Sequence, residues 1–511
     1  MNHKMIPLLI LLIISTCSHG LNILVILPHV GKSHQLVFEP LLKQLALREH
    51  NLTVITRFPQ TKITPNWRDI NIGDDEVATE FLDIDVEAGT RLTQFACRLL
   101  LVELGKHSCD DGLGKKELQM FLKENNQFDL VMVEIFNTNC FMGLVKLFDA
   151  PVIGLSSSRP PTWIERWFAN PENPSYIPTT FTGFSDSMTF LQRVENTLSL
   201  VWDKLIYEYF IAGPGNHSSR RYLGVDILKE FDAMYNVSLL LTNTHFSLNL
   251  PRPFVPNIIE VGGIHIEEPK EIPNKIAKFM NESSEGVIYM SMGSTLRGNS
   301  FPSDKRNAFL KVFSRIQQRV IWKWETNLTN KPVNVETFSW TPQREILCHP
   351  NMKVFISHGG LLGTIEAVYC GVPVIVIPQY GDQPLNAKAL EKVGGGVILY
   401  LQDATEKTIL QSLNKVLSPK FKKSAEDLSE RFKDRPLSPM ETAIYWIEYV
   451  AKYRGAPHIR TAAVLMPAYQ YLLIDVIAFI ALIVISFSYC MYKIAASVFL
   501  KLRRRNKIKT S

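Results

Sequence analysis

The sequence predicts an α/β protein with two parallel-sheet domains, followed by a membrane-spanning helix. Two series of buried-type strands, separated by a proline-rich stretch, predict domains over residues 21–250 and 274–453. Strands that alternate with amphipathic helices favour parallel sheets, because parallel neighbours need a crossover connection. The chain of 511 residues is long enough for two cores and further segments at its ends.

The first series opens with a β–α–β unit. Residues 21–28 form an apolar run typical of a buried strand, and apolar residues spaced as one helix face follow over 38–46. Residues 52–55 return as a second strand, which implies a parallel pair. Further strands are predicted at 130–133 and 152–155.

A proline cluster separates the two series, and we place a linker over 251–273. The preceding residues 156–250 are rich in aromatics and irregular helices, which suits a variable apolar pocket. A helical segment over 427–453 is expected to pack back on the first domain. The strands of the second series are predicted at 287–290, 320–324, 354–356, 374–377 and 397–400.

Both ends of the chain carry membrane-targeting patterns. Residues 1–20 combine Lys4 with an apolar run and small residues, which fits a cleaved secretory signal. A span is predicted over 472–495, where 17 residues from Val476 onward carry no charge. Basic residues crowd the tail 496–511, so the positive-inside rule places that tail in the cytosol and the body in the lumen.

The remaining composition excludes some classes of function. Seven basic residues follow Tyr492, so the net charge of +6 belongs to the tail and does not indicate a nucleic-acid partner. No CxxC or HExxH pattern predicts a metal site. The lumenal cysteines are odd in number, and Cys97 with Cys109 is a possible disulfide. Sequons that agree with a lumenal body begin at Asn51, Asn216, Asn236, Asn281 and Asn327.

Polar groups gather at one edge of the second predicted sheet, over residues 340–383. A strand ends at Ser357-His358-Gly359-Gly360, and a helix carrying Glu366 follows. The glycine pair lets a phosphate approach backbone amides at a helix N-terminus. Asp382 and Gln383 follow the next strand, and ligands of such sheets bind at the carboxyl ends of strands. The stretch therefore predicts a nucleotide site.

This stretch resembles the donor-binding segment of the UDP-glycosyltransferase family. The pattern Trp340-x-Pro342-Gln343, Ser-His-Gly-Gly, Glu366 and Asp382-Gln383 occurs in register over 44 residues, and similarity extends over nearly the whole chain. The chain looks most like the membrane-bound animal branch, including insect UDP-glucosyltransferases. The resemblance implies a GT-B architecture, in which two Rossmann-like domains face a cleft. It also implies a UDP-sugar and a small lipophilic acceptor as substrates, no metal, and endoplasmic-reticulum retrieval by Lys507-Ile-Lys509.

Each part of a UDP-sugar needs a different partner, and the resemblance supplies them. Trp340 would stack on uracil with Gln343 at its edge, the alternative for Trp340 being a place in the core. Glu366 would accept the ribose hydroxyls. Asp382 and Gln383 would take the sugar hydroxyls.

The diphosphate would be held by His358 and by backbone amides, which favour anions at a helix N-terminus. The alternative for His358 is a structural role at a strand end. The chain departs from the family pattern at Leu362, where an asparagine often stands, so one side-chain donor is lost. The amides expected to take part are those of Gly360, Gly363 and Thr364 and, in a second turn, Gly293 and Ser294.

Inverting sugar transfer needs a base on the acceptor hydroxyl. The family uses a histidine after the first strand, and the match here is His34, with His29 as a competitor. A neutral imidazole is a suitable general base. The family pairs this histidine with a carboxylate, for which Glu134 and Asn139 compete, and only Glu134 can stabilise an imidazolium. A buried Glu134 without a catalytic duty is the alternative.

We therefore expect a membrane-anchored, lumenal, inverting UDP-glycosyltransferase. Glucose is the expected donor sugar and glucuronate the second choice. The alternative is a catalytically silent relative that binds a lipophilic ligand or a UDP-sugar. A dinucleotide-dependent oxidoreductase is disfavoured, because no G-x-G-x-x-G follows the first strand.

Overall fold

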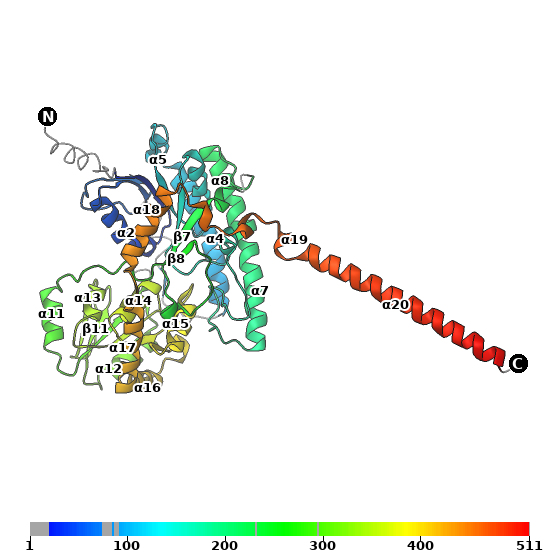
Figure 1. The fold of residues 1–511 in the computed structure, drawn as a ribbon. Helices are drawn as coiled ribbons and strands as arrows, with labels where there is room; N and C mark the ends of the chain where they lie inside the picture. The colour runs from blue at the N-terminus through cyan, green and yellow to red at the C-terminus, as the bar shows by residue number, and fades with distance from the viewer. Residues whose placement is uncertain (1–19, 74–83, 86–90, 230–231, 294–295, 510–511) are drawn as a thin grey trace, which may run out of the picture. The chain divides into compact units, whose positions relative to one another are not determined.

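The structure is a computed structural model that describes residues 20–73, 84–85, 91–229, 232–293 and 296–509 (Figure 1). The chain forms two compact units, one ending at Arg460 and the other beginning at Thr461. The predicted signal sequence lies outside the described residues except for Gly20.

Seven parallel strands form the first sheet, in the order β3-β2-β1-β5-β6-β7-β8. Strand β1 (Asn22–Leu27) pairs with β2 (Asn51–Thr56) on one side and β5 (Leu130–Glu134) on the other, and α2 (Lys32–Leu47) provides the first crossover. The sheet grows outward in opposite directions from β1 and β5, so the gap between them is a topological switch point. The other strands are β3 (Trp67–Asn71), β6 (Val152–Ser156), β7 (Val237–Thr242) and β8 (Ile258–Glu260).

Six parallel strands form the second sheet, in the order β12-β11-β9-β13-β14-β15. Its centre is β9 (Val287–Ser291), which lies between β11 (Arg319–Lys323) and β13 (Met352–Ser357). The switch point of this sheet lies between β9 and β13. Two such sheets confirm the predicted α/β class with two Rossmann-like halves. The outer strands are β12 (Val335–Phe338), β14 (Val374–Val376) and β15 (Gly396–Ile398).

The boundary between the two halves differs from the predicted linker 251–273. Strand β8 lies inside that range and pairs with β7, so the first sheet extends further along the chain than predicted. The prolines there flank an edge strand, where the ladder tolerates them. Helix α18 (Pro439–Lys452) packs Ile444 and Ile447 into the core of the first sheet, as expected for that part of the 427–453 segment. Residues 427–433 belong instead to α17 (Pro419–Lys433), whose Leu428 and Phe432 pack into the core of the second sheet.

The suggested disulfide between Cys97 and Cys109 is wrong. Both residues lie on α4 (Arg91–Gly114), and twelve residues of α-helix separate them by about 18 Å, well beyond the roughly 7 Å that a disulfide allows. Cys109 instead bonds to Cys140, just after β5, and Cys97 stays free and buried. This disulfide ties α4 to the segment that follows Glu134.

The second unit contains α20 (Ile474–Lys509). Its part Ile474–Arg503 is long and apolar enough to cross a membrane, and its most apolar window is not buried within the described structure. A core helix of a soluble domain would be buried, so this exposure favours a span over the core alternative.

Candidate active site

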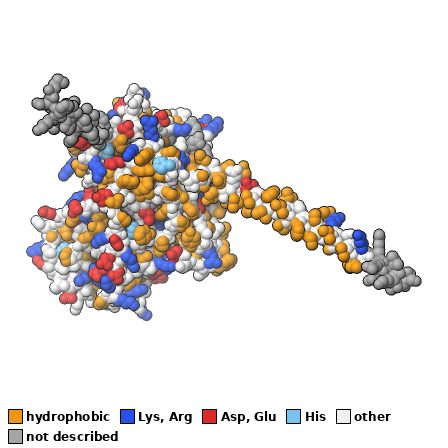
Figure 2. All heavy atoms as spheres, in the orientation of Figure 1, with side chains coloured by type: hydrophobic (Ala, Val, Ile, Leu, Met, Phe, Trp, Pro, Cys, Tyr) orange, Lys and Arg blue, Asp and Glu red, His pale blue; other side chains and the backbone are white. Residues whose placement is uncertain are grey.

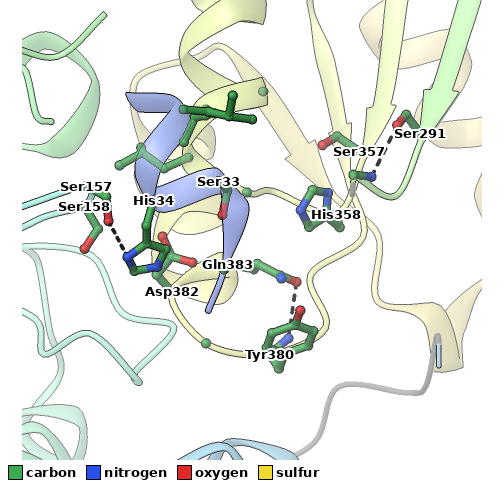
Figure 3. Close-up of a pocket in the computed structure, with 18 of the residues that line it drawn as sticks. Ser33, His34, Ser157, Ser158, Ser291, Ser357, His358, Tyr380, Asp382 and Gln383 are labelled. Carbon is green, nitrogen blue, oxygen red and sulfur yellow. Dashed lines mark hydrogen bonds between the residues drawn. The ribbon is translucent and has the colours of Figure 1, made fainter. Parts of the chain in front are cut away.

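A cavity of about 460 Å³ brings the predicted site residues together. Side chains from the carboxyl ends of both sheets line it (Figure 3). Two predicted residues, Glu134 and Thr364, do not line the cavity, and Ser294 lies outside the described residues. The others that were predicted do line it: His34, Gly293, Trp340, Gln343, His358, Gly360, Gly363, Glu366, Asp382 and Gln383.

His34 lies in the first turn of α2 and is held by groups that follow two neighbouring strands. Its Nδ1 is 2.5 Å from Oε1 of Glu134, the last residue of β5, and Glu134 is buried. Ser157, just after β6, places its Oγ 3.0 Å from the same nitrogen. A proton on Nδ1 facing the carboxylate leaves Nε2 as the ring atom that can accept a proton.

The two competing residues occupy other places. His29 stacks on His34 with ring centroids 3.7 Å apart, and its Nδ1 accepts a hydrogen bond from the Gly31 amide. Burial, and then the neighbouring His34, lower the pKa of His29 well below its ordinary value. Asn139 is buried with its amide oxygen facing Gly215, and its amide atoms have no hydrogen-bond partner among the described residues. The structure therefore pairs His34 with Glu134.

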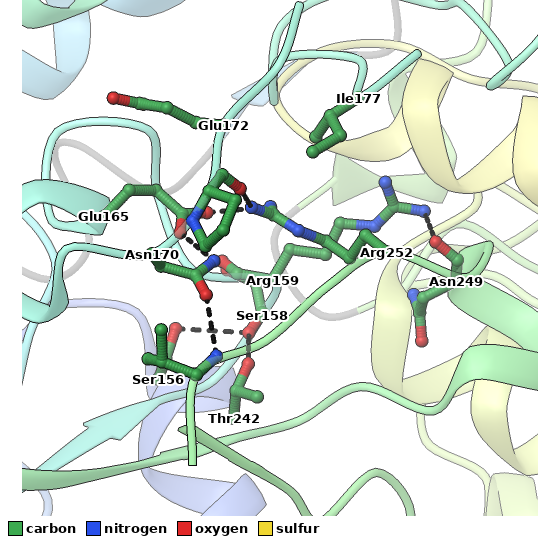
Figure 4. A network of polar contacts seen from close by, with 12 residues as sticks. Ser156, Ser158, Arg159, Glu165, Asn170, Glu172, Ile177, Thr242, Asn249 and Arg252 are labelled. Carbon is green, nitrogen blue, oxygen red and sulfur yellow. Dashed lines mark hydrogen bonds and ion pairs between the residues drawn. The ribbon is translucent and has the colours of Figure 1, made fainter. Parts of the chain in front are cut away.

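A buried polar network fixes the loop that carries Ser157 (Figure 4). The Ser158 carbonyl accepts a hydrogen bond from Thr242 Oγ1 at 2.8 Å. Nearby, Glu165 and Arg252 form an ion pair of 2.7 Å with both side chains almost fully buried. Burial raises the pKa of Glu165 to about 7, although the Arg252 charge opposes that rise.

His358 follows β13 and lies between two glycine turns. A Cβ on Gly293 would come within 2.6 Å of the His358 ring, and a Cβ on Gly360 would come within 2.5 Å. Only glycine permits this approach, and Gly293 also has a positive φ of 86°. Burial, and then the Lys323 charge, lower the pKa of His358 to about 4, so the ring is neutral. Its buried Nδ1 has no hydrogen-bond partner in the described part of the chain.

Helix α14 (Leu361–Tyr369) begins directly at this point, with Gly360 as its N-cap. The first amides of a helix have no partner inside it and can bind an anion. The prediction for Thr364 is wrong, because its amide and its hydroxyl both donate to the Gly360 carbonyl, at 3.0 and 2.9 Å. A disulfide between Cys348 and Cys370 joins the end of α13 (Gln343–Leu347) to the end of α14.

Glu366 and Gln343 form one polar group on the wall of the cavity. Gln343 Nε2 donates to Glu366 Oε2 at 2.7 Å, and the Tyr289 hydroxyl contacts Thr341 at 2.8 Å behind them. Burial raises the pKa of Glu366 to about 7. Trp340 is 68% exposed at the rim, so it is not a core aromatic and its ring is free to stack on a base.

Asp382 and Gln383, at the start of α15 (Gln383–Lys392), line the cavity together with His34. Figure 3 shows His34 beside Asp382, and burial raises the Asp382 pKa, although the Asn386 hydrogen bond and the His34 charge oppose that rise. Asn386 donates to Asp382 Oδ2 at 2.8 Å. The side-chain oxygen of Gln383 accepts from the Tyr380 amide at 3.2 Å, so its NH₂ group remains as the donor for a ligand.

The sequence did not single out Lys323 or the apolar wall of the cavity. Lys323 ends β11 beside His358 and pairs with Glu325 at 2.9 Å. The apolar wall comes chiefly from α4, whose leucine-rich stretch was the available signal. Trp163 and Trp167 of the aromatic insert are buried in the protein instead. The apolar residues that line the cavity are Leu36, Cys97, Leu100, Leu101, Leu104, Phe136, Phe181, Leu361 and Leu362.

The two sheets and the cavity at their carboxyl ends define a glycosyltransferase of the GT-B class. Two solved structures share this fold. The glycotransferase of kitacinnamycin matches with a TM-score of 0.53 at 17% identity, over 84% of this chain and 99% of that chain. The spinosyn forosaminyltransferase SpnP matches with a TM-score of 0.55 at 18% identity, over 84% of this chain and 100% of that chain.

Residues 11–509 match the family described as UDP-glucoronosyl and UDP-glucosyl transferase, and the chain belongs to this family of UDP-glycosyltransferases. The UDP-glycosyltransferase UGT5 of Dactylopius coccus is 42% identical, over 92% of this chain and 91% of that protein. UDP-glucosyltransferase 2 of the same insect is 38% identical, over 94% of this chain and 93% of that protein. The human UDP-glucuronosyltransferase 1A9 is 32% identical, over 79% of this chain and 76% of that protein.

Proposed function

We propose that this UDP-glycosyltransferase transfers glucose from UDP-glucose to a hydroxyl group of a small lipophilic acceptor, with inversion at the anomeric carbon. The observation that carries the proposal is His34, paired with the buried Glu134 behind it, on one wall of a cavity whose other wall is the α14 N-terminus. The pair supplies a base, and the helix N-terminus suits a diphosphate.

The chemistry follows from this arrangement. His34 Nε2 takes the proton of the acceptor hydroxyl as its oxygen attacks the anomeric carbon, and Glu134 stabilises the imidazolium that forms. The bond from that carbon to the diphosphate breaks, and UDP leaves. Lys323, His358 and the first amides of α14 stabilise the charge that develops on the diphosphate. One displacement inverts the configuration of the sugar.

The lining of the cavity supports a neutral donor sugar. Among the described residues that line it, Lys323 is the only lysine or arginine, and it lies beside His358 on the diphosphate side. The Asp382 carboxylate, near the sugar, would repel the carboxylate of a glucuronate. The similarity to an insect protein named a UDP-glucosyltransferase agrees with glucose. The leucines of α4 support an apolar acceptor.

The test uses membranes that carry the full chain, supplied with UDP-glucose or UDP-glucuronate and a set of phenols and alcohols. We expect UDP release with UDP-glucose and a product of inverted anomeric configuration by proton NMR. His34→Ala should abolish transfer while UDP still binds. Turnover that survives in His34→Ala but is lost in His29→Asn would assign the base to His29. Preference for UDP-glucuronate would refute the proposed donor.

We also propose that the chain is anchored by the Ile474–Arg503 segment with its body in the lumen of the endoplasmic reticulum. Two disulfides favour an oxidising compartment. Of the five predicted sequons, Asn216 is buried within α8 (Gly213–Leu223) and is a poor glycan acceptor, whereas the other four asparagines are exposed. In sealed microsomes the body should resist added protease, and its digestion without detergent would contradict this orientation.

A further inference from the structure

Helix α7 (Phe190–Ile206) turns its polar side toward the protein. The buried Asn196 amide donates to the carbonyls of Pro174 and Ile177, both at 2.8 Å. The buried Asp203 pairs with Arg98 of α4 at 2.6 Å. These bonds are made only in this rotation of the helix, so its apolar side must face outward.

The outward side of α7 carries an apolar stripe, which continues onto α4 and onto the turn of helix after Ile206, and we call this surface the outer face. Trp202 of this face lies 6.4 Å from the ring of Phe95 on α4, which is also exposed. Among the exposed residues from 190 to 210, Glu208 is the only charged one. Figure 2 shows hydrophobic side chains along the side of the molecule where Figure 1 draws α7. The outer face consists of Phe95, Leu99, Phe190, Leu191, Val194, Leu198, Val201, Trp202, Leu205, Tyr209 and Phe210.

An apolar stripe of this length on a soluble surface marks a place of interaction, because scattered apolar residues are common but contiguous ones are not. A helix with one apolar face and one polar face is the form that lies in a membrane interface. The polar face of such a helix usually meets water. In α7 the polar residues Asn196 and Asp203 meet the protein, so apolar residues make up most of what the helix exposes, with Thr197 as an exposed polar residue among them.

The chain leaves the first unit at Arg460, which donates to the Tyr235 carbonyl. Only the segment Thr461–Leu473 separates this exit from the span, and it can reach at most about 45 Å. If the apolar residues of that segment also lie in lipid, less of the segment is left to bridge the distance between Arg460 and the bilayer. Its exposed apolar residues are Leu465, Met466, Tyr469, Tyr471, Leu472 and Leu473.

We propose that the outer face lies in the interfacial layer of the lipid bilayer, as a second membrane contact of the enzyme. This inference rests on the membrane anchor proposed above. Helix α4 has Phe95 and Leu99 on the outer face and Leu100, Leu101 and Leu104 on the cavity wall. The contact therefore places lipid one helix away from the acceptor site.

The test places a fluorescent probe on the outer face of the full chain in phosphatidylcholine nanodiscs. The background is Cys490→Ser, because among the described residues Cys490 is an exposed free thiol and Cys97, the other one there, is buried. An NBD probe on Leu198→Cys reports the outer face, and the matched control is Leu47→Cys on α2, since Leu198 and Leu47 are 66% and 70% exposed. Labelled variants must keep the UDP release of the unlabelled protein.

We expect the Leu198→Cys probe to emit at shorter wavelength and to lose about half of its emission or more when lipids spin-labelled just below the headgroup are present. The Leu47→Cys probe should do neither. A Leu198→Cys probe that behaves like the control would overturn the proposal. Energy transfer between two labelled copies without quenching by lipid would also overturn it, in favour of a dimer. Alkaline carbonate tests the anchor separately, because release of the chain from microsomes would refute the span and not the outer face.

Discussion

Replacement of Glu134 by glutamine should lower kcat with little effect on donor binding. The Glu134 carboxylate lies 2.5 Å from His34 Nδ1 and is buried, so its charge is poorly screened by water. The ground-state imidazole is neutral in the proposed mechanism and becomes charged only during transfer. The carboxylate therefore acts on the transition state and not on the bound substrates.

The magnitude follows from the charges. Two unit charges about 4 Å apart interact by about 4 kcal/mol at an effective dielectric constant of about 20. Loss of this interaction corresponds to roughly a thousandfold decrease in kcat, because about 1.4 kcal/mol equals a factor of ten. Glutamine keeps the size of the side chain, so packing around His34 should change little.

The assay is UDP release at saturating UDP-glucose and acceptor, with UDP affinity measured by calorimetry on the same preparations. Asn139→Ala is the matched control, because Asn139 is also buried after β5 but faces Gly215. We expect Asn139→Ala to keep kcat within about threefold of the wild type, a change below 1 kcal/mol. A Glu134→Gln variant with wild-type kcat, or one that loses UDP binding as well, would refute the reasoning.

Two further predictions concern buried carboxyl groups. The raised pKa of Glu366, about 7, means that this group is increasingly protonated below pH 7, so UDP-glucose affinity should weaken by up to about tenfold per pH unit there. Glu366→Gln should bind more weakly and without this pH dependence, and equal slopes for the two proteins in calorimetry would contradict the assignment. Arg252→Met leaves the buried Glu165 with Asn170 as its remaining partner among the described residues and should cost about 1–3 kcal/mol of stability at pH 8. The pKa of Glu165 is already about 7 and rises further without Arg252, so the neutral form escapes this cost, and the loss in thermal midpoint should be smaller near pH 5.5. The same loss in thermal midpoint at both pH values would contradict this prediction for Glu165.

Much of the site could be predicted because its residues follow strands. The apolar runs of β1, β5, β9 and β13 mark where the strands end, and parallel strands bring those ends to one edge. The proximity of His34 to Glu134, 100 residues away, follows from this topology together with the family pattern. We preferred Glu134 over Asn139 as the partner of His34 because only Glu134 carries a charge. The structure adds a geometric reason, because Glu134 is the last residue of β5 and so lies at the edge where His34 is found.

The remaining features depend on tertiary contacts that spacing does not carry. The pairing of Cys109 with Cys140 depends on how α4 lies against the segment after β5. Thr364 differs from the prediction because its amide is the first one in α14 that is hydrogen-bonded within the helix, to the Gly360 carbonyl. Lys323 is a single lysine at a strand end, without a motif around it, and its approach to His358 depends on the strand order β11-β9-β13.

The departure from the family pattern at Leu362 has a physical reason in the contact between the two sheets. Leu362 lies in the first turn of α14 and lines the cavity, and its side chain also packs against the core of the first sheet. An asparagine there would offer a hydrogen bond to the donor but would place a polar amide against that apolar surface. Lys392 adds an ion pair of 2.6 Å to Asp186 of the first half. Apposition of the two halves therefore rests on contacts of the protein itself, which hold His34 across the cavity from α14 without a ligand.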